Sequence, residues 1–302
     1  VPVFLFRDKK NYFLGGDRMS QNENTLKELL KEGFTHGGVF HADDVFATAL
    51  LKILNPNIHI SRGFSVPESF SGIVYDIGGG KYDHHQKNSR MRENGVPYAA
   101  FGLIWEQFCQ ELLSKEDAKA FDEYFIQPID RSDNTGEENI MSLIISDRLP
   151  TWQENTVKME EAFWEAVAFA QKILEQRFKQ IRADREAYEI VIRKAKECRG
   201  GILYLEPVVP WKEALRDYPK DILFVIYPSI RGGYNIQAVP CREDKNALRH
   251  PFPQSWCGAS PQELQKLTGI KDITFCHKAG FLSVAETLEG AFSVARLVIH
   301  GD

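Results

Sequence analysis

The sequence predicts an α/β fold with a mainly parallel sheet flanked by helices in its first half, then a helical linker and a smaller C-terminal α/β domain. Strand-like and helix-like segments alternate over the first hundred residues, as is typical of parallel sheets. A long charged segment then repeats apolar side chains at helical spacing. Beyond residue 200, short strand-like runs are separated by Pro and Gly turns. The predicted regions are 1–32, 33–155, 156–198 and 199–302.

The first 32 residues are expected to be an N-terminal extension and lead-in. Met19-Ser20 resembles a translation start, so residues 1–18 are left out of the fold prediction. Residues 24–32 are polar and predict a short helix before the first strand.

The region 33–155 is expected to be a compact domain. Its first strand should end at His36. Asp43 and Asp44 stand where a helix N-cap is expected, and Asn55-Pro56 ends that helix. Further strands are predicted at 58–60 and 73–76, followed by mostly helical structure from 99 to 129. Ligands gather at the carboxyl ends of parallel strands, so this edge of the sheet is the expected site.

The region 156–198 predicts one long helix that could bridge two domains. Arg199-Gly200-Gly201 should close it. In the last hundred residues, strands are predicted at 202–205, 222–227, 234–239 and 273–276, with a final helix over 285–298.

The composition is that of a soluble globular protein, with 43% hydrophobic and 26% charged residues. A net charge of −5 gives no support for unspecific nucleic-acid binding through a basic surface. Bound cations would, however, add positive charge where phosphates bind. Five cysteines without a CxxC pair favour a reducing compartment, and we expect a cytoplasmic location, or an organellar or nuclear one in a eukaryote. No apolar run reaches the length of a membrane span, so no membrane partner is expected; a homo-oligomer is left open.

Four of the eight histidines, His36, His41, His84 and His85, stand within fifty residues beside several carboxylates. Burying such groups without partners would cost several kcal/mol, whereas both imidazole and carboxylate bind divalent cations. Two cations about 3.5–4 Å apart need a bridging carboxylate, and Asp76, at the end of a buried strand, is well placed for that role. The constellation comprises His36, His41, Asp43, Asp44, Asp76, Asp83, His84, His85, Asp130 and Asp133.

The Asp83-His84-His85 motif resembles the signature of the DHH phosphoesterase superfamily, whose relatives include RecJ-type nucleases and manganese inorganic pyrophosphatases. The segment His36-x4-His41-x-Asp43 is one residue longer than the usual first motif and carries His41 in place of an Asp. This variant resembles the Myg-type exonuclease family, which is also labelled metal-dependent protein hydrolase. Similar segments at 130–134, 210–213 and 277–281 extend the resemblance over nearly the whole chain from about residue 33.

The resemblance implies a DHH-type catalytic domain at 33–155, a DHH-associated-like substrate domain at 199–302, and two divalent metal ions. Manganese is expected, with magnesium, cobalt, iron and zinc as alternatives. By resemblance, His36, His41 and Asp76 would ligate one metal, and Asp43, His84 and Asp133 the second, with Asp76 bridging.

The resemblance also implies roles beside the metals. His85 would contact the scissile phosphate, while Asp83 and Asp130 would orient imidazoles. Asp44 would either accept a proton from water or serve only as a helix cap. Basic residues near the motif are either phosphate contacts or a solvated loop: Lys81, Lys87, Arg90 and Arg92. The segment with His277 and Gly280 is either a phosphate site or a turn.

The implied function is a two-metal 3′→5′ exonuclease that hydrolyses RNA or short oligonucleotides. One alternative is a hydrolase of a small phosphoanhydride or dinucleotide, which the low basic content suits slightly better. A second is a non-enzymatic binding protein with a vestigial site. Peptide hydrolysis is chemically open to two metals, but nothing in the sequence indicates a peptide groove.

Overall fold

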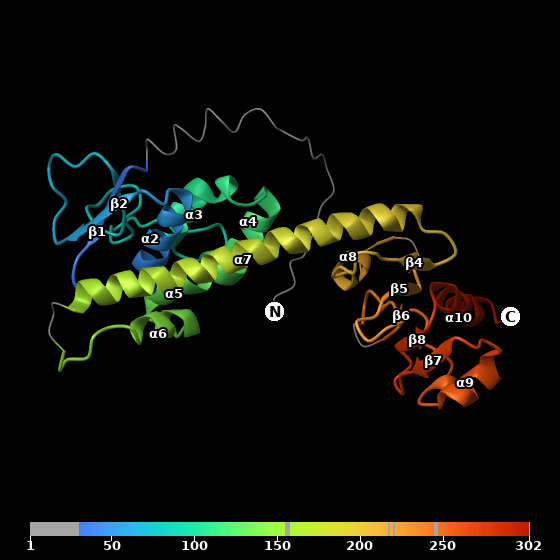
Figure 1. The fold of residues 1–302 in the computed structure, drawn as a ribbon. Coiled ribbons are helices and arrows are strands. Elements are labelled where there is room, and N and C mark those ends of the chain that lie inside the picture. Colours follow the sequence, from blue (N-terminus) through green and yellow to red (C-terminus); the bar gives the residue numbers. More distant parts are fainter. Residues whose placement is uncertain (1–29, 155–157, 217, 220, 245–246, 302) are drawn as a thin grey trace. The chain divides into compact units, whose positions relative to one another are not determined.

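The computed structural model describes residues 30–154, 158–216, 218–219, 221–244 and 247–301 (Figure 1). The chain divides into two compact units, one ending at Ile181 and the other beginning at Arg182. The predicted α/β class is confirmed, since the first unit holds a parallel sheet and the second a mixed one. Of the predicted extension and lead-in helix, all but residues 30–32 lie outside the described residues. Among the described helices, none has the length and apolarity to cross a membrane.

The sheet of the first unit has three parallel strands in the order β2-β1-β3. They are β1 (Glu32–His36), β2 (His59–Gly63) and β3 (Ile73–Val74). Because all three strands run in one direction, their carboxyl ends meet at one edge of the sheet. His36 ends the central strand, and Asp76 follows β3 by two residues.

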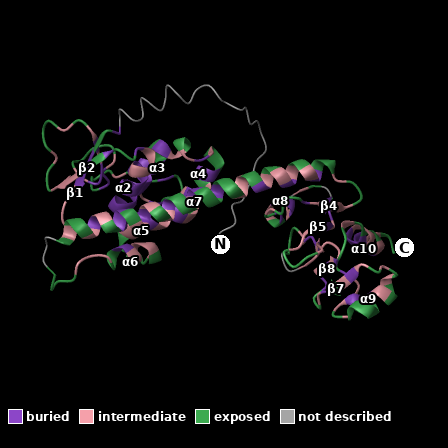
Figure 2. Ribbon diagram, in the orientation of Figure 1, coloured by how far each residue is buried: buried purple, intermediate pink, exposed green. Residues whose placement is uncertain are grey.

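Helix α2 (Ala42–Leu54) leaves this edge of the sheet and forms the centre of the first unit. Ten consecutive residues, from Ala42 to Leu51, are buried, and Figure 2 shows the helix almost wholly in purple. A helix buried on all sides belongs in a core, and here Phe46 stacks on Phe101 of the next helix. The other helices of this part are α3 (Ala100–Phe108), α4 (Lys115–Phe121), α5 (Gln127–Thr135) and α6 (Ile140–Ser146), with a π-turn at Asp122–Ile126 between α4 and α5.

The predicted long helix is α7 (Lys158–Glu197), with residues 156–157 outside the described part. Its apolar stripe as far as Ile181 packs into the core of the first unit, where Phe178 stacks on Trp105 of α3. Val191 and Ala195, further along, belong to a core of the second unit. The stripe therefore serves packing in both units.

The second unit is built on a mixed five-stranded sheet in the order β4-β5-β6-β8-β7, in which only the β4–β5 pair is parallel. The predicted final helix begins at Leu288 rather than at Ala285, because Leu282–Ala285 forms strand β8 between β6 and β7. The elements are β4 (Ile202–Tyr204), α8 (Lys212–Arg216), β5 (Phe224–Pro228), β6 (Tyr234–Ala238), α9 (Pro261–Thr268), β7 (Ile273–Cys276), β8 and α10 (Leu288–His300).

Candidate active site

The carboxyl ends of β1 and β3 bring an imidazole and a carboxylate together. The Nε2 atom of His36 lies 3.2 Å from Oδ2 of Asp76 and 3.2 Å from Oδ2 of Asp44. Asp76 has φ 58°, a left-handed conformation that is uncommon for a residue other than glycine. Its backbone N–H donates to the carbonyl of Tyr82 at 3.0 Å, which helps to hold this conformation. Such backbone strain persists where the surroundings fix it, and it is concentrated at functional sites.

Two carboxylates come from the first turn of α2. The N-cap is His41, so Asp43 and Asp44 lie inside the helix rather than at the predicted N-cap. The helix starts earlier because Oδ1 of Asp44 reaches back and accepts the N–H of His41 at 2.9 Å. Carboxylates are favourable at this end of a helix because its dipole is positive there. Asp44 therefore caps the helix and also faces His36.

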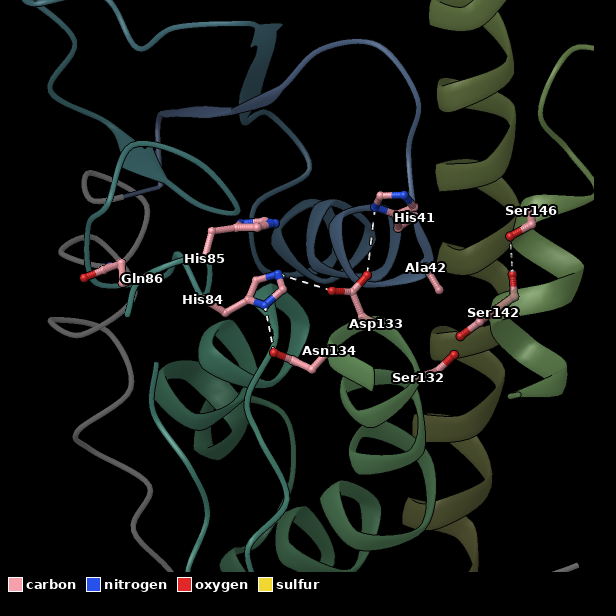
Figure 3. Close-up of a pocket in the computed structure, with 10 residues that line it drawn as sticks. All are labelled: His41, Ala42, His84, His85, Gln86, Ser132, Asp133, Asn134, Ser142 and Ser146. Carbon is pink, nitrogen blue, oxygen red and sulfur yellow. Dashed lines mark hydrogen bonds and ion pairs between the residues drawn. The ribbon is translucent and has the colours of Figure 1, made fainter. Parts of the chain in front are cut away.

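His84 lies at the centre of the carboxylates, as Figure 3 shows for Asp133. Its Nε2 atom is 3.0 Å from Oδ1 of Asp76, 3.3 Å from Oδ2 of Asp133 and 3.6 Å from Oδ2 of Asp43. Its Nδ1 atom lies 3.2 Å from Oδ1 of Asn134.

The orientation of Asn134 determines which nitrogen of His84 carries the proton. The Asn134 Nδ2 group donates to the carbonyls of Asp130 at 2.8 Å and Tyr98 at 3.1 Å, so its Oδ1 must face the ring. An amide oxygen only accepts hydrogen bonds, and Nδ1 is therefore the protonated nitrogen. Nε2, which faces the carboxylates, is then the nitrogen that can release its proton and bind a cation, an arrangement typical of histidine ligands of metals.

His85 is held by Asp83 and remains largely exposed. Oδ1 of Asp83 accepts the backbone N–H of His85 at 3.0 Å and lies 2.9 Å from its Nδ1. Oδ2 of Asp83 accepts the N–H of Gly79 at 2.7 Å, which fixes the carboxylate itself. The side chain of His85 is 63% exposed, and it lines the pocket beside His84 (Figure 3).

The ligand atoms fall into three close groups. They are His36 with Asp44 and Asp76; His41 with Asp43 and Asp133; and Asp76 with His84 and His85. Asp76 is shared by two groups, with Oδ2 towards His36 and Oδ1 towards His84. Nδ1 of His41 lies 3.9 Å from Oδ1 of Asp133. His41 is therefore grouped with Asp43 and Asp133, whereas the resemblance implied one metal site of His41 with His36 and Asp76.

The electrostatics of the cluster favour a bound cation. Burial, then the neighbouring charges of Asp76, Asp133 and Asp44, raises the pKa of Asp43 well above its usual range. No described residue donates a hydrogen bond to the buried Oδ1 of Asp43, although buried polar atoms are nearly always paired. A donor set of imidazole nitrogens and carboxylate oxygens suits divalent cations such as manganese or zinc, so the residues fit such ions.

The histidines offset part of this charge. Burial lowers the pKa of His36, but the hydrogen bonds that its ring donates to Asp44 and Asp76 outweigh this effect and raise the pKa to about 10. The pKa of His84 is likewise lowered by burial, and Asp76 and Asp133 raise it to about 9. For Asp76, burial raises the pKa, but bonds to His36 and His84 lower it to about 2.

Arg92 and Asp130 form a separate buried cluster. The Arg92 side chain is 6% exposed, and its Nη2 donates to Asp130 at 2.8 Å and to Asp122 at 2.7 Å. Its Nη1 donates to the carbonyl of Pro97 at 3.1 Å. This guanidinium is committed to protein groups, which disfavours its expected contact with phosphate. Asp130 faces Arg92 and the N–H of Gly102 rather than an imidazole, so its link to His84 runs through Asn134.

The remaining expected substrate contacts lie elsewhere. Lys81 donates to Gln107, and Arg90 pairs with Glu106 at 2.6 Å, so both lie against α3. Lys87 is exposed. In the second unit, Nδ1 of His277 accepts the N–H of Ala279 at 3.1 Å, and Gly280, with φ 65°, donates to the His277 carbonyl. These bonds describe a local turn.

Four residues of the cluster, His41, His84, His85 and Asp133, line a pocket of about 480 Å³ (Figure 3). The sequence indicates no role for Asn134, although this residue lies in the 130–134 segment that resembles the family. Ser142 and Ser146 also carry no chemical signal in the sequence, since their four-residue spacing only places them on one helix face. The lining residues are His41, Ala42, His84, His85, Gln86, Ser132, Asp133, Asn134, Ser142 and Ser146.

Comparison with known proteins identifies the family. The MYG1 exonuclease model, described as "Uncharacterised protein family (UPF0160)", matches residues 34–299. A MYG1 exonuclease of Homo sapiens is 30% identical over 319 residues, covering 88% of this chain and 85% of the relative. MYG1 proteins of Chlamydia pneumoniae and Schizosaccharomyces pombe are 30% and 28% identical, over 88% and 87% of this chain and 96% and 95% of their own lengths. No solved structure matches the chain. With a family model that spans most of its length, the chain belongs to the MYG1 exonuclease family.

Proposed function

We propose that this chain is a metal-dependent 3′→5′ exonuclease that hydrolyses RNA or short oligonucleotides. The observation that carries the proposal is the clustering of four carboxylates and four imidazoles beside a pocket that His41, His84, His85 and Asp133 line, in a chain of the MYG1 exonuclease family. The direction of cleavage and the preference for RNA rest on the family resemblance alone.

Seven residues would hold two divalent cations, with Asp76 shared between them: His36, His41, Asp43, Asp44, Asp76, His84 and Asp133. When bound, such a pair of cations supplies an activated water molecule and neutralises charge on the phosphoryl oxygens. The chain's part is to fix the geometry. Asn134 orients His84, and the capping bond of Asp44 fixes its carboxylate against His36.

His85 is the residue we assign to the phosphate. Asp83 holds its Nδ1, so the proton sits there and Nε2 is presented to the pocket. In this orientation Nε2, once it is protonated, can donate to a phosphoryl oxygen or give its proton to the leaving oxygen. Asp83 is thus a positioning residue, fixed in turn by the N–H of Gly79.

The alternative is a hydrolase of dinucleotides or small phosphoanhydrides. The pocket volume of about 480 Å³ favours it, because pockets of this size take ligands of small-molecule dimensions. Comparing kcat/KM for a dinucleotide, pyrophosphate and a 20-nucleotide RNA separates the two functions, since only an exonuclease on polymers turns over the long chain efficiently.

The test uses the full chain, Mn²⁺ and single-stranded RNA labelled at either end. A 3′→5′ exonuclease shortens 5′-labelled RNA progressively and releases label from 3′-labelled RNA as a mononucleotide at once. EDTA should stop both. No shortening by protein with confirmed bound metal would sink the proposal.

The roles of the adjacent histidines can be separated by substitution. His84→Ala should lower metal occupancy, because His84 faces three carboxylates of the centre. His85→Ala should keep the metals and lose turnover, because its ring is exposed and held by Asp83. Elemental analysis of the purified variants measures the first effect and a single-turnover assay the second. Equal metal loss in both variants would contradict the division.

A further inference from the structure

A second groove lies on the first unit, on the outer side of strand β2. It has a volume of about 570 Å³ and is lined by residues of α2, β2 and the start of α7. None of its lining residues lines the pocket at the metal centre. β2 is an edge strand of its sheet, so its outer backbone groups have no strand partner among the described residues.

Arg62 links this groove to the metal centre. Its side chain is 2% exposed and its Nη2 donates to the carbonyl of Gly38 at 3.1 Å. Gly38 lies in the loop between His36 and His41, and residue 63 is the register partner of His36. Nη1 of Arg62 pairs with Glu160 at 3.0 Å, while its buried Nε finds no acceptor among the described residues. The groove therefore begins beside the loop that carries two proposed ligands.

The groove also offers an aromatic ring and a cation. Trp164 is only partly buried, unlike its neighbour Phe163, and its Nε1 donates to Glu160 at 2.9 Å. The Nζ of Lys52 lies 5.7 Å from the centre of the indole ring. Lys52 forms no ion pair within the described part of the chain, so its charge is available to an anion. The exposed His59 lines the same groove.

These features match the chemistry of single-stranded nucleic acid. A flat aromatic ring stacks any base, and a nearby cation neutralises the phosphate that follows it. We propose that the groove binds the nucleic-acid strand outside the pocket, with a base stacked on Trp164 and its phosphate at Lys52. The inference rests on the proposed function in its choice of ligand, and it adds a subsite that would hold a polymer while its end is in the pocket.

Binding without turnover tests the groove. Fluorescence anisotropy of a labelled single-stranded RNA decamer is measured in EDTA with the full chain. Trp164→Ala should weaken binding about tenfold, the loss of one stacked base, whereas Trp164→Phe should keep most of the affinity. Lys52→Gln should weaken binding and lower the salt dependence by about one phosphate contact. The matched control is Trp152→Ala, since Trp152 is 92% exposed in the same unit but does not line the groove.

The outcomes separate the two proposals. Wild-type affinity in both Trp164→Ala and Lys52→Gln would overturn the proposal that the groove binds RNA, even if the protein degrades RNA. Binding that depends on Trp164 without any hydrolysis in Mn²⁺ would support the groove and sink the exonuclease. Circular dichroism shows whether Trp164→Ala is folded. If it is not, the affinities of Lys52→Gln and Trp164→Phe still test whether the groove binds RNA. A hydrolysis rate that rises from dinucleotide to decamer in wild type, and rises less in Lys52→Gln, would support the subsite further.

Discussion

Two buried acidic clusters lie side by side in the first unit, and they differ in the cation that faces the carboxylates. In one, Arg92 bonds Asp122 and Asp130 directly. In the other, imidazoles face four carboxylates, and one oxygen of Asp43 has no donor among the described residues. An arginine stays charged and cannot be exchanged. A histidine can give up its proton and bind a metal through the same nitrogen. The second cluster is therefore the one whose residues fit an exchangeable cation.

Helix α5 joins the two clusters. Asp130 faces Arg92, and Asp133, three residues later, faces His84 and His41. Asn134 bonds the carbonyl of Asp130 on one side and His84 on the other. The arginine cluster thus supports the position of a proposed metal ligand, and the two clusters should respond differently to substitution.

Removing the shared carboxylate should have the largest effect. Asp76→Asn is expected to lower turnover on RNA by about 10³-fold or more, because it weakens both cation positions, which contribute several kcal/mol to catalysis. Asp147→Asn, at an exposed carboxylate after α6, is the matched control and should keep wild-type turnover. Steady-state kinetics with elemental analysis measures both. Full activity of Asp76→Asn would contradict a catalytic role for the cluster of imidazoles and carboxylates.

Removing the arginine should instead affect stability. Arg92→Met is expected to destabilise the fold by about 3 kcal/mol, because it leaves buried Asp130 without its partner. Burial raises the pKa of Asp130 to about 7 even beside Arg92. A raised carboxyl pKa means that the native state binds a proton which the unfolded chain releases above about pH 4. The deficit should therefore shrink as the pH falls from 8 towards 5.

Urea denaturation at several pH values measures this prediction. EDTA-treated protein should show the full deficit, because Arg92 contacts no proposed ligand. A deficit that grows as the pH falls would contradict the assigned role of Asp130.

The sequence predicts which side chains gather at this edge of the sheet more completely than it predicts their surroundings. His36 and Asp76 were placed at strand ends because the periodicity of a parallel sheet determines which residues reach its carboxyl edge. The start of α2 was placed at Asp43 and Asp44, since Asp is a common N-cap. The structure has His41 there, because Asp44 caps from the third helical position.

What the sequence could not provide were the pairings between distant residues. The sequence predicts Arg92 as a possible phosphate contact because its loop follows the Asp83-His84-His85 motif. Its actual partners, Asp122 and Asp130, are brought to it only by the fold. The sequence likewise gives no indication of the role of Asn134, because that role depends on two carbonyls and one imidazole that meet at its amide only in the fold. In the second unit, the sequence predicts no strand at Leu282–Ala285, because the pairing of β8 with β6 and β7 is non-local, and its last residue falls in the predicted final helix.

Removing the link between the clusters should have an intermediate effect. Asn134→Ala is expected to lower manganese affinity or turnover 10- to 100-fold, the usual cost of losing a partner that orients a histidine ligand. Thr135→Ala is the matched control, because the Thr135 hydroxyl bonds only nearby backbone groups: it donates to the carbonyl of Arg131 and accepts the N–H of Glu137. Isothermal titration with Mn²⁺ measures both variants. Equal affinities for Asn134→Ala and wild type would show that His84 is oriented without the amide.

The smallest expected effect has the opposite sign. In metal-free protein, Asp43→Asn should raise the free energy of unfolding by about 1 kcal/mol, the worth of one added hydrogen bond. Asp43 is fully buried, lies among Asp76, Asp133 and Asp44, and has an oxygen without a donor. An amide removes the repulsion and can donate to a neighbouring carboxylate, while its oxygen keeps the N–H of Ala100. Adding Mn²⁺ should stabilise wild type and leave this variant nearly unchanged, because binding of a ligand to the native state is what shifts stability.

Asp130→Asn is the matched buried carboxylate, and it should destabilise the fold because it weakens the bond to Arg92. Chemical denaturation of the two variants in EDTA and in Mn²⁺ decides the point. If Asp43→Asn destabilises the metal-free protein as Asp130→Asn does, both clusters are structural and the proposed distinction between them fails.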